Sequence, residues 1–249
     1  MRANGIAALT TLPVLANVDA PGGSISDLTY GGGFVGTFYL VNTGAASASF
    51  TLSFYNQSGA PVSVPLSLPL TFPQGAAATT TATYNTPILS AGASYWVQGS
   101  GAITSTLLTG SAQLTTTGNI SGFVIFRYNP NSQEAVVPLE SRNASSYVLA
   151  FDNTAGTVTG VALSSSSAQN TNVPVVIHDD TGTQIGTSSI PLNANGHASF
   201  TLDPTHGFPA TAGIRGTLEF VAPLGVPIGV LGIRSPPALT FTKLPALAK

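Results

Sequence analysis

The densest group of side chains able to do chemistry is His178-Asp-Asp180. An imidazole beside two carboxylates could bind a divalent cation or transfer protons. Thr181-Gly182 follows, and Asp at such a place is typical of a hairpin turn, where its carboxylate accepts hydrogen bonds from backbone amides. No ligand series continues to the bidentate glutamate of an EF-hand. We therefore interpret the group as a turn, and we predict neither a metal nor a cofactor.

The other two histidines are isolated in the sequence. His197 follows Gly196 and begins a predicted strand, so we interpret it as a side chain that flanks a turn. His206 lies in the loop Asp203-Pro-Thr-His-Gly-Phe-Pro209, where ligand binding is the less favoured interpretation. Nine carboxylates and three histidines form no Gly-x-Ser-x-Gly, His-Glu-x-x-His or Walker motif. We predict that the chain is not an enzyme.

Charge is scarce along the whole chain. Charged residues make up 6% of it, against about 25% in ordinary soluble domains, and residues 28–126 contain no Asp, Glu, Lys, Arg or His. Because 43% of the residues are apolar, we expect a folded chain and not a disordered one. A net charge of −2 offers no basic surface for nucleic acid. The charge-free surface is either wetted by hydroxyl and amide groups or covered by neighbouring subunits or glycan.

The few charges that remain suggest ion pairs. Arg127 is close in sequence to Glu134 and Glu140, and either glutamate could pair with Arg127 or Arg142. We expect such pairs to fix the junction between two modules and not to bind a ligand.

The elements that carry these residues are predicted to be strands. The 27 Gly and 18 Pro leave few windows for a helix. Runs of β-branched and aromatic residues predict strands; they lie at residues 34–41, 49–55, 122–128, 173–178, 198–202 and 216–221. Many short strands separated by turn residues are typical of sandwiches. No run of 18 apolar residues predicts a membrane-spanning helix.

The two halves of the chain repeat the same order of strands and turns. The clearest matches are residues 33–42 with 156–165, 50–62 with 173–185, 110–114 with 216–220, and 122–127 with 229–234. We predict two tandem β-sandwich modules related by internal duplication, over residues 21–135 and 136–249. Residues 1–20 are predicted to form an N-terminal strand or extension.

A shorter repeat marks the ends of these modules. Thr11-Leu-Pro-Val-Leu-Ala16 is nearly repeated as Lys243-Leu-Pro-Ala-Leu-Ala248, and Val136-Val-Pro-Leu-Glu140 is a looser copy. We call these three the Leu-Pro segments. Proline confines a strand to a sheet edge or an entry position. Two interpretations stay open: each segment is an edge strand of its own module, or the terminal segments exchange between subunits as donor strands. The predicted assembly residues are Leu12, Pro13, Val14, Leu15, Leu244, Pro245 and Leu247.

The second half also resembles a known type of repeat. The residues that carry the resemblance are Phe151-Asp-Asn-Thr-Ala-Gly156, Gly196-His-Ala-Ser-Phe200, Phe208-Pro-Ala-Thr-Ala-Gly213 and Arg215-Gly-Thr-Leu-Glu-Phe220. They resemble an uncharacterised Ig-like β-sandwich repeat of secreted bacterial surface proteins, best over residues 135–249. The resemblance implies a surface location and an Ig-like sandwich, and it supplies no activity. The predicted fold is therefore all-β, with two tandem Ig-like β-sandwich modules.

These observations favour a structural subunit of an extracellular or cell-surface filament, in which copies of the chain join head to tail. We predict O-linked glycan as a further partner on the Ser/Thr tracts; the candidate positions are Thr79, Thr80, Thr81, Thr115, Thr116, Thr117, Ser165 and Ser166. The alternative is a monomeric secreted adhesion or carbohydrate-binding module that uses loops near Trp96 or His206. A single Trp in a strand is more often a core residue than a sugar-stacking one, so we expect Trp96 in the core.

Overall fold

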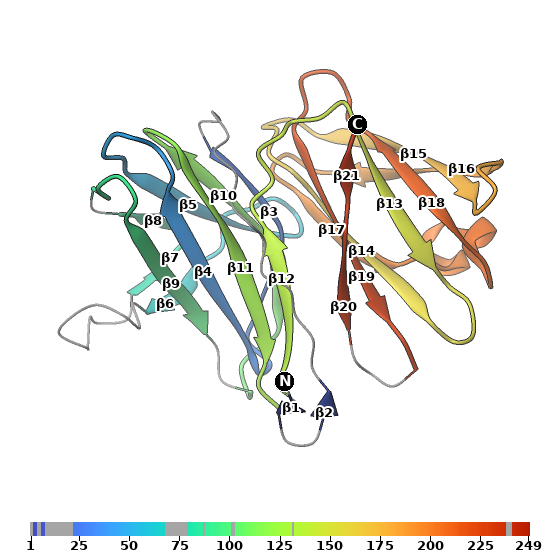
Figure 1. The fold of residues 1–249 in the computed structure, drawn as a ribbon, viewed down its shortest axis with the longest axis horizontal. Coiled ribbons are helices and arrows are strands. Elements are labelled where there is room, and N and C mark those ends of the chain that lie inside the picture. Colours follow the sequence, from blue (N-terminus) through green and yellow to red (C-terminus); the bar gives the residue numbers. More distant parts are fainter. Residues whose placement is uncertain are drawn as a thin grey trace.

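A computed structural model describes residues 22–67, 79–86, 88–100, 103–130, 132–237 and 241–249, together with two short paired strands, β1 (Arg2–Ala3) and β2 (Ile6–Ala7). The described part is all-β, as predicted, and its strands pair antiparallel (Figure 1). Its only helical turns are the 3₁₀ turns η1 (Pro204–His206) and η2 (Pro209–Thr211). Each of the six predicted strand runs coincides with a strand of the structure, two of them extending one residue beyond it.

The first sandwich packs two sheets face to face. One sheet has the order β3 (Gly22–Tyr30), β10 (Leu108–Thr116), β5 (Phe50–Asn56), β8 (Thr83–Asn85). The other has the order β12 (Gln133–Pro138), β11 (Ile120–Tyr128), β4 (Phe34–Asn42), β9 (Ser94–Ser100), β6 (Val64–Ser67), β7 (Thr79–Thr81). Phe38 of β4 meets Phe54 of β5 across the core, with ring centroids 5.8 Å apart.

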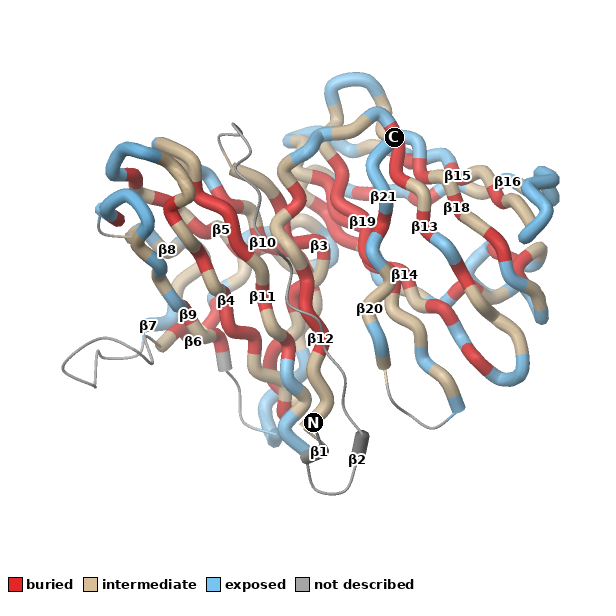
Figure 2. The backbone as a smooth tube through the Cα atoms, viewed as in Figure 1, coloured by how far each residue is buried: buried red, intermediate tan, exposed pale blue. Residues whose placement is uncertain are grey.

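The second sandwich is built in the same way. One sheet has the order β16 (Gln184–Leu192), β15 (Thr171–Asp179), β18 (Arg215–Val221), β13 (Ser146–Asp152), β21 (Leu247–Ala248). The other has the order β17 (His197–Thr201), β14 (Val158–Ser165), β19 (Ile228–Ser235), β20 (Thr242–Pro245). Tyr147, Leu149 and Phe220 fill the core between them. Buried positions run along the middle of each sandwich in Figure 2.

The two sandwiches share a strand order. The order β3–β10–β5 corresponds to β13–β18–β15, and β12–β11–β4–β9 corresponds to β20–β19–β14–β17. These pairs of strands carry the sequence matches described above. One element differs, because β6 pairs with β9 whereas β16 pairs with β15. The connection that follows β5 therefore crosses to the other sheet of the first sandwich, whereas the connection that follows β15 stays within one sheet of the second.

Each sandwich is closed at one edge by a segment that crosses between its sheets. In the first, β12 pairs with β11 and then Glu140 pairs with Ser24 of β3. In the second, β20 pairs with β19 and β21 pairs with β13. We call residues 133–140 and 242–248 the first and second closing segments. The predicted boundary at 135/136 falls inside β12, so the first sandwich extends to Glu140, and its Leu-Pro segment ends that sandwich and does not begin the next.

The sandwiches also pack on each other. Strand β3 lies against β14 and β19, and the two closing segments meet where β12 contacts β20. Ala162 and Leu231 of the second sandwich belong to the apolar cluster of the first. The junction is therefore a continuous packed interface.

Gly232 allows the second closing segment to approach the core. A Cβ on Gly232 would lie 2.5 Å from Leu149 Cδ1 and 3.0 Å from Leu244 Cβ. We expect Gly232→Ala to lower the free energy of unfolding by about 1–3 kcal/mol through overpacking. Gly160→Ala, on the neighbouring strand β14, is the matched control because its Cβ would meet nothing closer than 3.7 Å. Chemical denaturation measures both, and equal losses would contradict the packing argument.

Candidate functional site

The second closing segment contains the C-terminal residues predicted for assembly. Leu244 is half-buried and packs against the core, Ala246 is buried, and Pro245 is exposed. Leu247 points outward and is 64% exposed. The segment therefore inserts Leu244 and Ala246 into the sandwich and leaves the alternate residues outside. The predicted N-terminal assembly residues, Leu12, Pro13, Val14 and Leu15, lie outside the described residues.

Few contacts hold this segment in place. β20 forms four residue pairs with β19, and β21 forms two with β13. The Arg142 guanidinium donates to the carbonyl oxygen of Ala246 at 3.4 Å. At the far end, Lys249 Nζ lies 3.0 Å from a Glu219 carboxylate oxygen, and the Lys249 and Ser146 backbones bond to each other. It is a short edge strand fastened at both ends.

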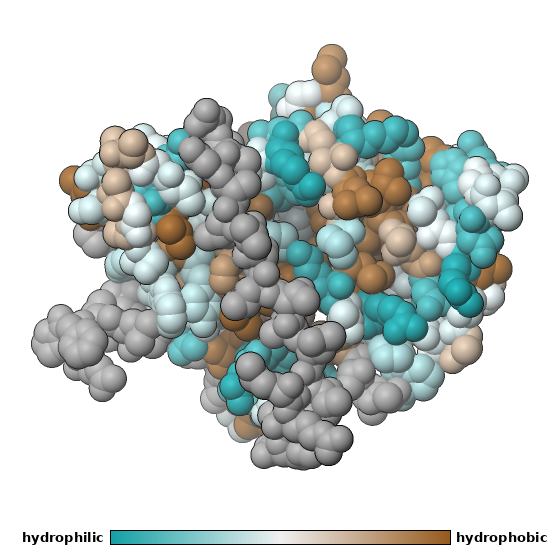
Figure 3. All heavy atoms as spheres, in the orientation of Figure 1, coloured by the Kyte–Doolittle hydropathy of each residue, from teal (hydrophilic) through white to brown (hydrophobic). Residues whose placement is uncertain are grey.

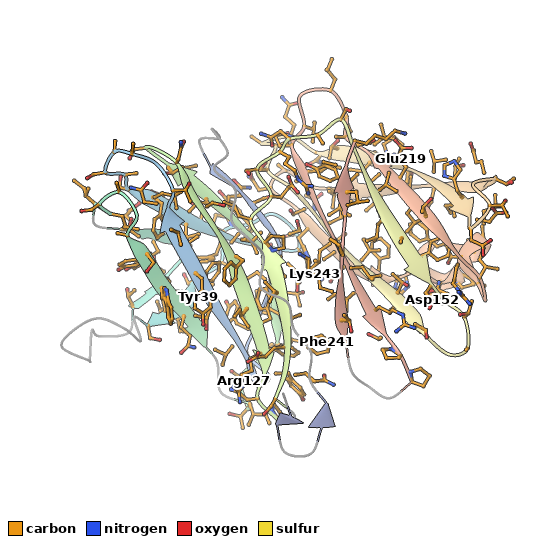
Figure 4. All side chains as sticks on the ribbon, in the orientation of Figure 1. Tyr39, Arg127, Asp152, Glu219, Phe241 and Lys243 are labelled. Carbon is orange, nitrogen blue, oxygen red and sulfur yellow. The ribbon has the colours of Figure 1, made fainter. Side chains whose placement is uncertain are left out.

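Lys243 is the residue of the second closing segment whose charge is disfavoured by burial. It lies at the junction between the sandwiches (Figure 4). Burial, together with the neighbouring Arg142 and partly offset by Glu140, lowers the pKa of Lys243 to about 8. Glu140 is already engaged by Arg142, which donates to both carboxylate oxygens. At neutral pH the second closing segment therefore holds a partly buried ammonium group that has no salt bridge of its own among the described residues.

A buried polar cluster lies deeper in the junction. A β-bulge in β3 sets Ser26 and Asp27 opposite the single residue Ser111 and so turns both toward the second sandwich. There Asp27 Oδ1 lies 3.8 Å from His197 Nε2. The His197 side chain is buried and makes no hydrogen bond of ordinary geometry to any residue that the structure describes, and the same holds for the hydroxyl of Ser164 beside it.

Burial shifts the pKa of both members of this pair toward the neutral form. The Asp27 side chain is 14% exposed, and burial raises its pKa to about 6 while Thr29 opposes the shift slightly. Burial lowers the pKa of His197 to about 4, and the Ser26 backbone opposes it. His197 begins β17, as predicted, but its side chain is an interface residue and not merely one that flanks a turn.

The other predicted polar groups serve local structure. Asp179 accepts hydrogen bonds from the backbone amides of Thr181 and Thr183 and closes the predicted turn. His206 Nδ1 lies 2.9 Å from Asp203 Oδ1 at the turn η1. No group of three or more His, Cys, Asp or Glu that could hold a metal occurs in the described ranges.

The predicted ion pairs form. Arg127 lies 3.7 Å from Glu134, and Arg142 pairs with Glu140 beside the junction. Arg234, at the place in β19 that Arg127 has in β11, pairs with Asp152. Hydrogen bonds from Thr154, together with Arg234, lower the pKa of Asp152 to about 2.

Trp96 is not a core residue. It is 37% exposed and lies on the outer face of the sheet, because its strand neighbour Val97 points into the core. Tyr39 lies directly beside it on β4, with ring centroids 4.5 Å apart, and Phe123 of β11 lies on the other side of Tyr39 at 5.2 Å. We call Trp96, Tyr39 and Phe123 the aromatic row. The expectation for Trp96 was wrong because its strand alternates in the opposite sense.

The predicted glycosylation positions differ in exposure. Thr79, Thr80, Thr115 and Thr117 are exposed, and Thr81, Thr116 and Ser166 are partly so. Ser165 is 1% exposed, and its hydroxyl accepts a hydrogen bond from the Ser167 amide, so a sugar on Ser165 would not fit this packing. Much of the first sandwich that is not grey in Figure 3 is pale, that is, of intermediate hydropathy, in keeping with its lack of charged residues between positions 28 and 126.

The described ranges contain no helix long and apolar enough to cross a membrane. No protein-family model and no curated protein matches the chain. Among solved structures, an anti-sigma factor domain-containing protein is similar at 10% identity, over 84% of this chain and 81% of that one, with a TM-score of 0.17. Similarity that low shows neither the fold nor the function of this chain, so its function is inferred from its own residues.

Proposed function

We propose that this chain is a structural subunit of an extracellular assembly, built by strand exchange between copies. Residues 11–16 of one copy take the place of the second closing segment in the next copy. Because donor and acceptor sites differ, each subunit can donate and accept at once, and the contact propagates as a head-to-tail polymer. We also propose that the two sandwiches are duplicated Ig-like repeats, as their common strand order suggests.

The observation that carries this proposal is that the sequence has more Leu-Pro segments than the two sandwiches have closing positions. The sequence has three Leu-Pro segments, and the two sandwiches offer two closing positions. Residues 133–140 and 242–248 occupy them. Both closing positions of the described part are thus occupied, which supports our proposal that the similar segment at residues 11–16 fills such a position in a second copy.

Chemistry favours the exchange. In the alignment of the two segments, Thr11 stands where Lys243 stands, so exchange would release the partly buried ammonium to water. Val14 replaces the buried Ala246 and would add apolar contact in the core. Pro13 replaces Pro245, so the exchanged strand keeps the same missing backbone donor.

Extracellular location and O-linked glycan belong to the same proposal. A surface with so little charge needs cover or hydrophilic decoration to avoid unspecific association, and the exposed threonines 79, 80, 115 and 117 are the positions that a glycan could occupy. The intact mass of native material tests this: glycan adds to the 25.1 kDa of the chain, and an unmodified mass would remove glycan from the proposal.

The alternating geometry of the closing position gives a matched test of exchange. Val14→Asp would place a carboxylate at the inward position of Ala246, where an unpaired charge is costly. Leu15→Asp would place the same charge at the outward position of Leu247. We expect negative-stain microscopy to show polymers for Leu15→Asp and the wild type, and dispersed particles for Val14→Asp. Normal polymers from Val14→Asp, or from a chain lacking residues 1–20, would contradict strand exchange.

A further inference from the structure

The outer face of the six-stranded sheet carries a feature that strand exchange does not use. Phe123, Tyr39 and Trp96 are directly opposed residues on the neighbouring strands β11, β4 and β9. Their rings form a line across the strands, and Figure 4 shows Tyr39 on this face of the first sandwich. Neighbouring strands lie about 4.8 Å apart, so the aromatic row extends over about 10 Å.

A hydrogen-bonding side chain lies beside the rings. Gln98 is the outward residue two positions along β9; its Nε2 donates to Oγ1 of Thr37 at 3.0 Å, and Thr37 itself is buried at 9% exposure, so Gln98 is the member of the pair that a ligand can reach. No charged residue lies on β4 or β9. The nearest ion pair on the sheet joins Arg127 of β11 to Glu134 of β12. Arg127 lies four residues along β11 from Phe123, and the two charges of the pair neutralise each other.

We propose that the aromatic row binds a neutral saccharide chain. The axial C–H groups of a pyranose ring pack on an exposed aromatic ring such as Trp96, which is 37% exposed and is held edge to face by Tyr39, itself stacked on Phe123. The equatorial hydroxyls of the sugar pair with amide side chains of the kind that Gln98 supplies. Nucleic acid would also stack on such rings, but it needs cationic side chains along the row. A second copy of this chain would need about 800 Å² of matched surface per partner, and the row is only one residue deep.

Trp96 is the chain's single tryptophan, so its fluorescence reports on this site alone. Titration of the full-length protein with cellohexaose or chitohexaose is expected to give a saturable emission shift. Tyr39→Ala and Phe123→Ala, which both retain Trp96, should weaken binding about tenfold or more. Tyr39→Phe keeps the ring and should bind within a few fold of the wild type. Ile88→Ala removes an apolar residue that is 76% exposed outside the row and should change nothing.

Each other outcome overturns the proposal. These are no shift at millimolar saccharide, a shift that survives Tyr39→Ala and Phe123→Ala when circular dichroism shows both variants folded, and a shift that depends on protein concentration alone, which would make the row a contact between copies. The same titration on Val14→Asp, which is expected not to polymerise, keeps this test separate from strand exchange.

Discussion

Asp27→Asn is expected to raise the free energy of unfolding at pH 8 by about 3 kcal/mol, and the gain should vanish as the pH falls to 4. Burial raises the pKa of Asp27 to about 6, so at pH 8 the junction contains a carboxylate that burial disfavours. His197, whose pKa burial lowers to about 4, is neutral there and does not compensate it. Asparagine keeps the shape and removes the charge.

His197→Gln is expected to have the opposite pH dependence. The unfolded chain protonates His197 below about pH 6.5, whereas the folded chain does so only near pH 4. The wild type therefore loses stability through His197 as the pH falls over this range, and it gains stability through Asp27 over nearly the same range. The difference in free energy of unfolding between the glutamine variant and the wild type should therefore change with pH. It should shift by about 3 kcal/mol in favour of the variant between pH 8 and pH 4.

Urea denaturation of the wild type, the two single variants and the double variant from pH 4 to pH 8 measures these differences. Asp152 and the remaining carboxylates are common to all four chains, so their contributions to the pH dependence cancel. The double variant should run parallel to the wild type because the two contributions nearly compensate. Single variants that both run parallel to the wild type would show that water reaches the junction and that the pair is not desolvated.

The positions of the strands were predictable because the β propensity of the residues within each strand is sufficient to identify it. β4 and β15 are rich in β-branched or aromatic residues, and a glycine-containing turn follows each of them, so neither depends on its neighbours for its identity. The turn at Asp179 was predictable for the same reason, since its hydrogen bonds all lie within four residues.

The packing between the two sandwiches, and which face of a strand is buried, were not predictable from the sequence. His197 looks like a residue beside a turn until β3 is packed on it, and the bulge that brings Asp27 there has no signature in Ser24-Ile-Ser-Asp27. Trp96 lies between Tyr95 and Val97, and a run of three large residues does not say which alternate set faces the core. In the structure the buried Gly99 lies two residues after Val97, so these two share the inner face of the strand, and Trp96 lies on the other face.

The boundary between the sandwiches was misplaced for a related reason. Val136-Val-Pro-Leu-Glu140 lies between two modules in the sequence, so the pattern alone fits either side. Pairing of β12 with β11 assigns it to the first sandwich. Once it is known to close a sandwich, the second closing segment is recognised as a strand of the same kind. The sequence likeness of residues 11–16 to that segment is what supports the proposed donor strand.

Deleting residues 242–249 from a chain that also lacks residues 1–20, so that no copy can donate residues 11–16, is expected to lower the free energy of unfolding by about 3 kcal/mol or more. The deletion uncovers the core beside β19 and β13, and it removes the burial of Leu244 and Ala246 together with the hydrogen bonds of two strand ladders. A synthetic peptide of residues 9–18 is then expected to bind the open position and to raise the melting temperature in a concentration-dependent way. It should add nothing to the stability of the intact chain while the second closing segment stays in place.

The peptide with Val14 replaced by Asp is the control, because it retains the length, the proline and every other side chain. It should fail to restore the melting temperature, since the inward position opposite the core accepts no charge. Equal rescue by both peptides would mean that the open edge binds any extended chain. No rescue by either would mean that residues 11–16 do not fit the position, and strand exchange would then fail at its first step. Rescue by the native peptide alone would identify the edge between β13 and β19 as the acceptor through which one subunit holds the next.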